Sequence, residues 1–450
     1  MDDFPLINDL PGDDTIVAIA TPPGRGALAI LRISGPCAFS IADGIWGTSI
    51  PVESYQPGQA KVGELILPEL HDTGVITVWK APKSYTGQDI VELTLHASPP
   101  LIESAENRII ELGARSAAPG EFTFRAIING KIEVHQAGAI AALIDSPGIS
   151  AAKAASRTLA GEFKSRMDAL IKYLAELRKD ITAEMEFPED VESFNDQQII
   201  SRAKSIQNDM NNLLQDIEIG EKNARLPIIV IAGPPNVGKS TLANALLRKE
   251  MSIVHPQPGT TRDLIEGECK FGGSLSTIID TAGLRETDNG VELIGVDLAY
   301  KKLDQADIIL LIFDGSTEES SEEKAILERI GNRESITVFN KTDLGLVRSP
   351  IDEIVISARD NQGLDKLREA IESKLIAEEC EGLWVGGWQK ESLQRAINAI
   401  ESAFRAMSGN SWDAAQGEFE DAERNLRLAI GENAPQDIIS VVLKDFCIGK

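Results

Sequence analysis

The strongest structural signal in this chain is the stretch I-I-V-I-A-G-P-P-N-V-G-K-S-T, which runs from Ile228 to Thr241. Its apolar, β-branched start is typical of a buried strand, and the run L-A-N-A-L-L at 242–247 is typical of a helix. Between them stands G-x-x-x-x-G-K-S, a spacing that lets backbone N–H groups turn inward around phosphates at the positive end of a helix. A glycine turn without a ligand is the alternative, but the strand before and the helix after are the context that a phosphate loop requires.

This loop supplies the first candidate site residues. We expect Lys239 to reach the β- and γ-phosphates of a nucleotide and the Ser240 hydroxyl to bind Mg²⁺. The candidate phosphate-binding residues are Asn236, Val237, Gly238, Lys239, Ser240 and Thr241.

Four later motifs complete a nucleotide site. They are G-T-T-R-D at 259–263, D-T-A-G at 280–283, N-K-T-D at 340–343 and S-A-R at 357–359. The last three follow expected strands, at the edge where open α/β sheets bind ligands. We expect Thr261 to bind Mg²⁺ only when a γ-phosphate is present, Asp280 to hold Mg²⁺ through water, and the Gly283 N–H to contact the γ-phosphate.

The last two motifs indicate which base is bound. Asp343 can accept hydrogen bonds from both N1–H and N2–H2 of guanine, a pairing that adenine cannot offer, and the Ala358 N–H can donate to guanine O6. Asn340 can meet the other edge of the purine, and Lys341 can cover the ring. We therefore predict that the ligand is GTP. The remaining candidate contacts are Thr260, Thr261, Asp280, Thr281, Ala282, Gly283, Asn340, Lys341, Asp343, Ser357, Ala358 and Arg359.

The residues for hydrolysis depart from those of small signalling GTPases, in which a glutamine after D-x-x-G orients the attacking water. Leu284 stands at that position, so the carboxylates available for this role are Glu286 and Glu292. Asn236 offers a neutral oxygen where a monovalent cation can bridge the phosphates and supply positive charge. The alternative is that Asn236 only caps the loop.

Composition limits the other possibilities. The 450 residues include 44 basic and 70 acidic side chains, a net charge of −26 that argues against nonspecific polyanion binding by the whole surface. Apolar runs are too short for a membrane span, and Met-Asp-Asp-Phe-Pro lacks the basic start of a signal peptide, so we expect a cytoplasmic protein without a membrane partner. The cysteines form no C-x-x-C pair, which favours reduced thiols over a disulfide framework or zinc site.

Hydrophobic patterning divides the chain into α/β and all-α parts. Short alternating strands and one helix suggest a small α/β domain over 1–118. Residues 119–220 are alanine-rich and helical, and 221–376 form the nucleotide domain. Residues 377–450 return to helical spacing, so the nucleotide domain is expected to be inserted in a helical-bundle domain.

With these residues laid out, the chain resembles the tRNA-modifying GTPase family known as MnmE or TrmE over essentially its whole length. Besides the GTPase motifs, the resemblance rests on T-P-P-G-R-G at 21–26, I-L-R-I-S-G at 30–35, S-Y-T-G at 84–87, P-G-E-F-T at 119–123, R-A at 125–126, N-G-K at 129–131 and the terminal C-I-G-K at 447–450.

The resemblance implies a K⁺-dependent GTPase that modifies C5 of the wobble uridine, position 34, of certain tRNAs. It implies a homodimer formed through N-terminal domains that resemble folate-binding one-carbon transfer domains. It also implies a heterotetramer with an FAD-dependent subunit, the FAD being on the partner, and a tetrahydrofolate derivative as carbon donor.

Carried over position by position, the resemblance makes Glu292 the general base that orients the water. It implies Mg²⁺ ligands at Ser240 and Thr261. The implied K⁺ ligands are Asn236, His255, Gln257 and Thr260, and the implied folate contacts are Arg32, Glu92, Lys131 and Lys450. For the folate contacts, ordinary surface or ion-pair roles are the alternative.

Three departures from the family pattern stand out. The K⁺ loop begins with His255 rather than Thr, His96-Ala97-Ser98 replaces His-Gly-Gly, and Pro234-Pro235 replaces Arg-Pro. Cys447 is either a thiol near the folate or a small buried residue, and buried cysteine is the commoner case. A GTP-switched ribosome-assembly or signalling factor is the alternative function, because the nucleotide domain alone would serve it equally well.

Overall fold

The structure is a computed structural model of the chain. It describes residues 12–186, 196–248, 266–280, 302–331, 333–347, 353–377 and 382–432. These fall into two compact units, one of residues 1–144, 155–217 and 384–450, and one of residues 145–154 and 218–383. The expected domain limits after residues 118, 220 and 376 stay a prediction.

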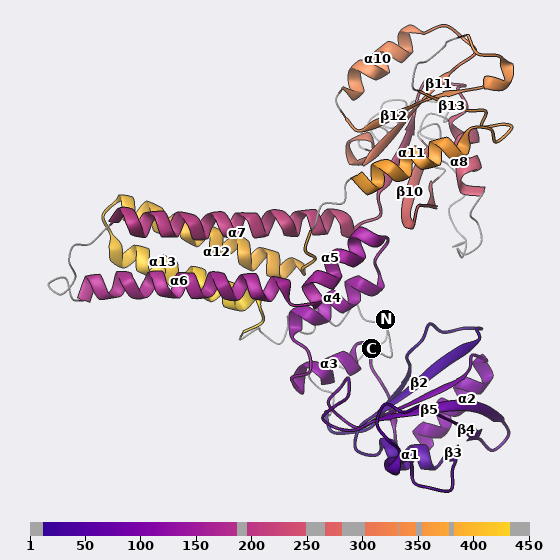
Figure 1. Ribbon diagram of the computed structural model, residues 1–450, viewed down its shortest axis with the longest axis vertical. Helices are drawn as coiled ribbons and strands as arrows, with labels where there is room; N and C mark the ends of the chain where they lie inside the picture. Colours follow the sequence, from indigo (N-terminus) through magenta and orange to yellow (C-terminus); the bar gives the residue numbers. More distant parts are fainter. Residues whose placement is uncertain are drawn as a thin grey trace, which may run out of the picture. The chain divides into compact units, whose positions relative to one another are not determined.

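The N-terminal part is an α/β domain built on a mainly antiparallel sheet (Figure 1). Its strands lie in the order β3-β4-β5-β6-β2-β1-β7, with β1 and β7 parallel. The strand bounds are β1 Ile16–Ile19, β2 Leu28–Ser34, β3 Trp46–Gly47, β4 Lys61–Ile66, β5 His71–Trp79, β6 Ile90–His96 and β7 Arg115–Ser116. The helices are α1 Ala38–Asp43, the 3-10 turn η2 Val52–Ser54, and α2 Pro99–Glu111.

Strand β1 is buried on both faces of this sheet, because successive side chains of a strand point to opposite faces. Val17 belongs to the core cluster that contains α1 and α2 residues. Its neighbours Ile16 and Ala18 point the other way and pack with Phe122 of α3, Glu121–Ile128. The strand β1 therefore joins a large core on one side to the α3 contact on the other.

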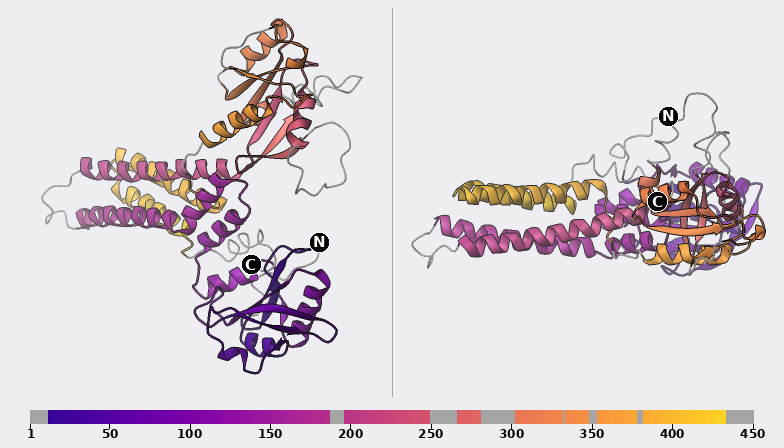
Figure 2. Two further views of the ribbon diagram at one scale, coloured as in Figure 1. Left: turned by 45° about the vertical axis from the view of Figure 1, so that its right-hand side comes forward. Right: turned by 90° about the horizontal axis from the view of Figure 1, so that it is seen from above.

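The helical part confirms the expected bundle. Its long helices are α6 Glu162–Glu186, α7 Asp196–Ala224, α12 Gly387–Ser408 and α13 Trp412–Ala429, preceded by α4 Val134–Ile144 and α5 Ile149–Leu159. The long helices lie side by side in Figures 1 and 2. The predicted apolar stripe of α6 is buried, at Leu170, Leu174, Leu177 and Ile181. Arg166 pairs with Asp216 of α7 at 2.5 Å, and Arg178 pairs with Glu423 of α13 at 2.6 Å.

The nucleotide domain is a doubly wound sheet in the order β13-β12-β11-β8-β10-β9, parallel except for the edge strand β9. The strands are β8 Ile228–Ala232, β9 Glu266–Phe271, β10 Ser274–Asp280, β11 Ile308–Asp314, β12 Ser335–Asn340 and β13 Ile354–Val355. The helices are α8 Lys239–Arg248, α10 Ser321–Ile330, α11 Leu364–Ala377 and the 3-10 turn η4 Thr342–Leu344.

Strand β11 shows why this sheet needs helices on both faces. Leu310 and Ile312 share a core cluster with residues of α8 and α11. Leu311 and Phe313 belong to the opposite cluster, with Ile330 of α10. A strand buried on both faces reads as one continuous apolar run, as the sequence shows at 308–313. The carboxyl ends of β8, β10, β11 and β12 consequently meet at one edge.

Candidate nucleotide-binding and folate-type sites

The phosphate loop occupies the turn between β8 and α8. Gly238 has φ +97°, and a Cβ added there would lie 2.4 Å from Asn340 Nδ2, so this position requires glycine. Lys239 is buried, and its Nζ donates to the carbonyls of Gly233 at 3.0 Å and Pro234 at 2.7 Å. The lysine therefore lies over the loop whose N–H groups are expected to hold phosphates.

Two oxygen-bearing side chains meet beside this loop. Ser240 Oγ, in the first turn of α8, donates to Asp280 Oδ2 at 2.5 Å. Asp280 is fully buried at the end of β10, which runs parallel to β8. Within the described ranges no group of three or more His, Cys, Asp or Glu residues has metal-binding geometry. One hydroxyl and one carboxylate nevertheless fit Mg²⁺, which takes a few protein oxygens together with water and substrate phosphates.

Asn340 joins the phosphate loop to the base-side loop. Its Nδ2 donates to Val237 O at 2.8 Å, and its Oδ1 accepts from Ala358 N at 2.9 Å. Asn340 is only 3 % exposed and lies at the end of β12. The Ala358 N–H that we expected to meet guanine O6 thus has a partner within the protein, and the two halves of the candidate site are bonded through one side chain.

The base-side residues are held by further polar contacts. Asp343 Oδ1 accepts from Ser357 Oγ at 2.9 Å, so the carboxylate predicted to select guanine is already oriented. Lys341 Nζ pairs with Asp314 Oδ2 at 2.7 Å. Burial alone would raise the pKa of Asp314, but hydrogen bonds from Lys341 and Ser316 hold that pKa below its ordinary value.

An open pocket of about 590 Å³ lies between α8 and the loop after β13. It is lined by Ser240, Thr241, Asn244, Ala245, Ala358, Arg359 and Asn361. It therefore brings together residues predicted to bind phosphate, Ser240 and Thr241, with residues predicted to bind the base, Ala358 and Arg359. Asn236, the predicted K⁺ ligand, is exposed on the phosphate loop with φ +63°.

Three of the expected folate contacts surround one loop of the N-terminal domain. Arg32 and Glu92 are cross-strand partners on β2 and β6 and form an ion pair at 2.8 Å. The Arg32 guanidinium lies 5.8 Å from the ring centre of Tyr85, and a Cβ added at Gly87 would lie 3.3 Å from Lys131 Cγ. The S-Y-T-G loop therefore touches both expected cations.

The other predicted site residues lie outside the described residues. They are His255, Gln257, Thr260, Thr261, Thr281, Ala282, Gly283, Glu292 and Lys450. Cys447 lies outside them as well. Their assignments stay predictions.

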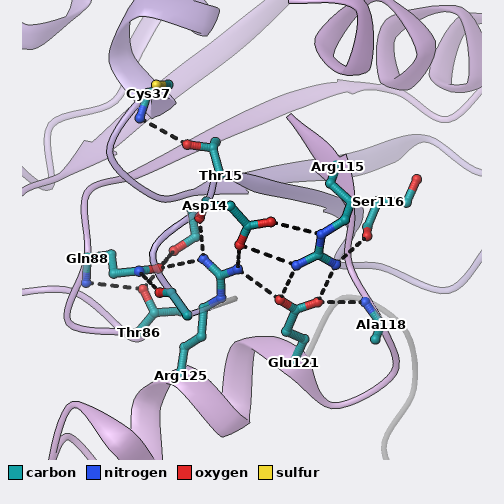
Figure 3. Close-up of polar contacts among 12 residues, drawn as sticks. Asp14, Thr15, Cys37, Thr86, Gln88, Arg115, Ser116, Ala118, Glu121 and Arg125 are labelled. Atoms are coloured by element: carbon teal, nitrogen blue, oxygen red, sulfur yellow. Dashed lines mark hydrogen bonds and ion pairs between the residues drawn. The ribbon is translucent and has the colours of Figure 1, made fainter. Parts of the chain in front are cut away.

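The structure also contains a buried ionic network that sequence reasoning did not single out (Figure 3). Arg125 is fully buried and pairs with Asp14 at 2.5 Å and Glu121 at 2.8 Å. Arg115 pairs with the same two carboxylates, each at 2.8 Å. The i, i+4 spacing of Glu121 and Arg125 in an apolar run is the one local signal that pointed to it.

The doubly wound sheet, the phosphate loop and the guanine-type base side define a P-loop GTPase. The remaining domains place it more narrowly. A family profile described as "GTP-binding protein TrmE N-terminus" matches residues 15–131, and one described as "MnmE helical domain" matches residues 134–447.

Curated relatives match the chain over nearly its whole length. The tRNA modification GTPase MnmE of Thermotoga maritima is 35% identical, over 97% of this chain and 100% of its own length. Its counterpart in Thermus thermophilus is 35% identical, over 97% of this chain and 99% of its own. That of Aquifex aeolicus is 36% identical, over 97% and 100%. The chain belongs to the MnmE family of tRNA modification GTPases.

Among the helices that the structure describes, none combines the length and the apolarity needed to cross a bilayer.

Proposed function

We propose that this chain hydrolyses GTP as a subunit of a cytoplasmic complex that modifies C5 of the wobble uridine of certain tRNAs. The observation that carries the GTP assignment is the pair of Asn340 hydrogen bonds, because they fix the phosphate loop and the base-side loop relative to each other. The tRNA assignment is supported by family membership over 97% of the chain.

Hydrolysis requires charge stabilisation and an oriented water. Ser240 and Thr261, with Asp280 through water, would hold Mg²⁺, which would supply positive charge to the phosphates. Lys239 places its ammonium beside the same phosphates, and Glu292 orients the attacking water. Asn236, His255, Gln257 and Thr260 would hold K⁺, which would supply the positive charge that an arginine finger brings to other GTPases.

The folate part of the proposal is supported by the chemistry of the donor set in the N-terminal domain. A reduced folate has a pterin edge of N–H donors, from which a carboxylate such as Glu92 can accept hydrogen bonds, and Arg32, ion-paired with Glu92, lies at the same end. Its glutamate tail carries carboxylates with which a cation such as Lys131 can pair. The aromatic ring of Tyr85 beside Arg32 offers a surface for a flat heterocycle. These residues would hold a tetrahydrofolate derivative, which supplies the one-carbon unit.

The assembly proposed is a homodimer through the N-terminal domains that joins an FAD-dependent subunit in a heterotetramer acting on tRNA. Deleting the gene tests this function. We expect the wobble-uridine modification to be lost. The wild-type chain should restore it, and the Lys239→Ala variant should not. Normal tRNA with accumulated immature ribosomal subunits would contradict the account and favour an assembly factor.

A further inference from the structure

The loop from Ser84 to Gln88, between β5 and β6, is held by side chains of α3, by Asn129 directly after α3 and, on its other side, by Ser34 of β2. This loop touches Arg32 through the Tyr85 ring and approaches Lys131 at Gly87. The loop therefore lies beside Arg32 and Lys131, two of the residues proposed to contact the folate.

Helix α3 and the residue after it reach the loop at three points. Thr123 Oγ1 lies 2.9 Å from Tyr85 OH, and Arg125 Nη1 donates to Gln88 Oε1 at 3.1 Å. Asn129 Nδ2 donates to the Thr86 carbonyl at 2.7 Å.

Gly87 shows how closely the loop is seated. With φ +80°, it adopts a conformation that favours glycine, and a Cβ added there would lie 2.9 Å from Asn129 Cβ. The loop backbone thus passes directly over Asn129, with no room for a side chain between them. Close packing at Gly87 and the hydrogen bond to Thr86 therefore both hold the loop against Asn129.

The helix that makes these contacts is itself rigidly anchored. Figure 3 shows Arg125 of α3 bonded to Asp14, to Glu121 of its own helix and to Gln88. From the opposite side, Ser34 Oγ lies 2.8 Å from Thr86 Oγ1. A partly buried polar network with several shared partners favours one arrangement of the groups that it joins.

We propose that Asn129 is a positioning residue of the folate-type site, because it pins the Thr86 carbonyl and so holds the 84–88 loop against Arg32 and Lys131. Arg125 supports the same loop from within the network. This inference rests on the proposed folate function. Asn129 would thus raise folate affinity through the 84–88 loop, without its own side chain contacting the folate.

The test uses the full-length chain with Asn129→Ala and Asn129→Asp, since an ionised carboxylate has no hydrogen to donate to the Thr86 carbonyl. Asn398→Ala is the matched control, because Asn398 is an exposed asparagine on α12 whose side chain accepts a 3.3 Å hydrogen bond from the exposed Gln394. Hydrogen exchange of the 84–88 amides is measured without ligand, and 5-formyltetrahydrofolate affinity is measured by calorimetry. The melting temperature and the GDP affinity report on folding.

Loss of one hydrogen bond is expected to weaken folate binding about three- to tenfold and to speed amide exchange in the loop, with melting temperature and GDP affinity unchanged. Unchanged folate affinity and exchange in both variants would overturn the inference. If the wild-type chain itself does not bind the folate, the proposed folate function fails, and the exchange rates alone then decide whether Asn129 positions the loop.

Discussion

Ser240 Oγ donates a 2.5 Å hydrogen bond to Asp280 Oδ2, so the start of α8 and the end of β10 meet at two oxygen atoms. These are the atoms expected at a Mg²⁺ ion. Ser240→Ala should lower Mg²⁺-dependent GTP affinity by about ten- to a hundredfold, because it removes a proposed ligand. Nucleotide dissociation should slow with Mg²⁺ in the wild type and not in the variant. An equal response to Mg²⁺ and EDTA in both chains would contradict the assignment.

Asp343 should determine the base. Asp343→Asn replaces a carboxylate, which accepts from guanine N1–H and N2–H2, with an amide that also presents donors. GDP affinity should fall by about 10²-fold or more, while XDP, whose O2 is an acceptor, should bind better than to the wild type. Competition against a fluorescent guanine nucleotide measures both. Asp360→Asn is the control, since Asp360 is an exposed neighbour whose Oδ2 lies 3.4 Å from Ser357 Oγ. Equal effects of the two substitutions would contradict the role of Asp343.

The ionic network of the N-terminal domain should make that domain sensitive to acid. Burial alone would raise the pKa values of Asp14 and Glu121, but hydrogen bonds from Arg115 and Arg125 hold both pKa values below the ordinary 3.8 and 4.5. Carboxylates with lowered pKa values stabilise the fold above those ordinary values, and this stability is lost as the pH falls through the folded-state values.

Glu121→Gln tests the network directly. It should cost about 3 kcal/mol at neutral pH, because it leaves buried arginine charge less well paired, and it should flatten the loss of stability below pH 4.5. Denaturant unfolding followed across pH measures both effects. Glu111→Gln is a suitable control, because Glu111 is exposed and pairs only with Arg108 among the described contacts of α2. A wild-type acid profile in Glu121→Gln would refute the prediction.

His135 should give the helical part a second pH dependence. Burial lowers its pKa below 6.5, although Glu133 Oε2 lies 3.3 Å from Nδ1 and the charges of Lys164 and Asp168 also act on the ring. The unfolded chain therefore takes up this proton first, so stability present above pH 6.5 is lost as the pH falls toward the folded-state pKa. His135→Phe should remove this slope, which begins below about pH 6.5. Helix unfolding monitored by circular dichroism measures it, and a slope that persists would show that another group titrates.

Much of the nucleotide site was visible in the sequence because its signals are local. The apolar run before Asp280 predicted a strand over 275–280, and the structure places β10 at Ser274–Asp280. The same reasoning placed N-K-T-D at the end of β12. In each case the strand and the polar residues that follow it are adjacent, so hydrophobic periodicity and motif agree.

The long-range hydrogen bonds that assemble the sites could not be predicted from the sequence. Asn340 is hydrogen-bonded to Val237, 103 residues away in the sequence, and Arg125 to Asp14, 111 residues away. No motif spacing predicts contacts over such separations. That Asn340 meets the purine stays a prediction, and the structure adds that its amide bonds to two loops of the protein. The two-residue strand β7 was also missed, because its pairing with β1 depends on the tertiary fold.

The central claim is best tested by the GTP hydrolysis rate of the purified chain in K⁺ and in Na⁺, with Glu292→Ala and Glu286→Ala compared. We predict strong activation by K⁺ that Glu292→Ala abolishes and Glu286→Ala leaves in place, since Glu292 is the proposed general base. Equal slow rates in both salts, unchanged by Glu292→Ala, would contradict a cation-assisted GTPase and favour a simple GTP-switched binding factor.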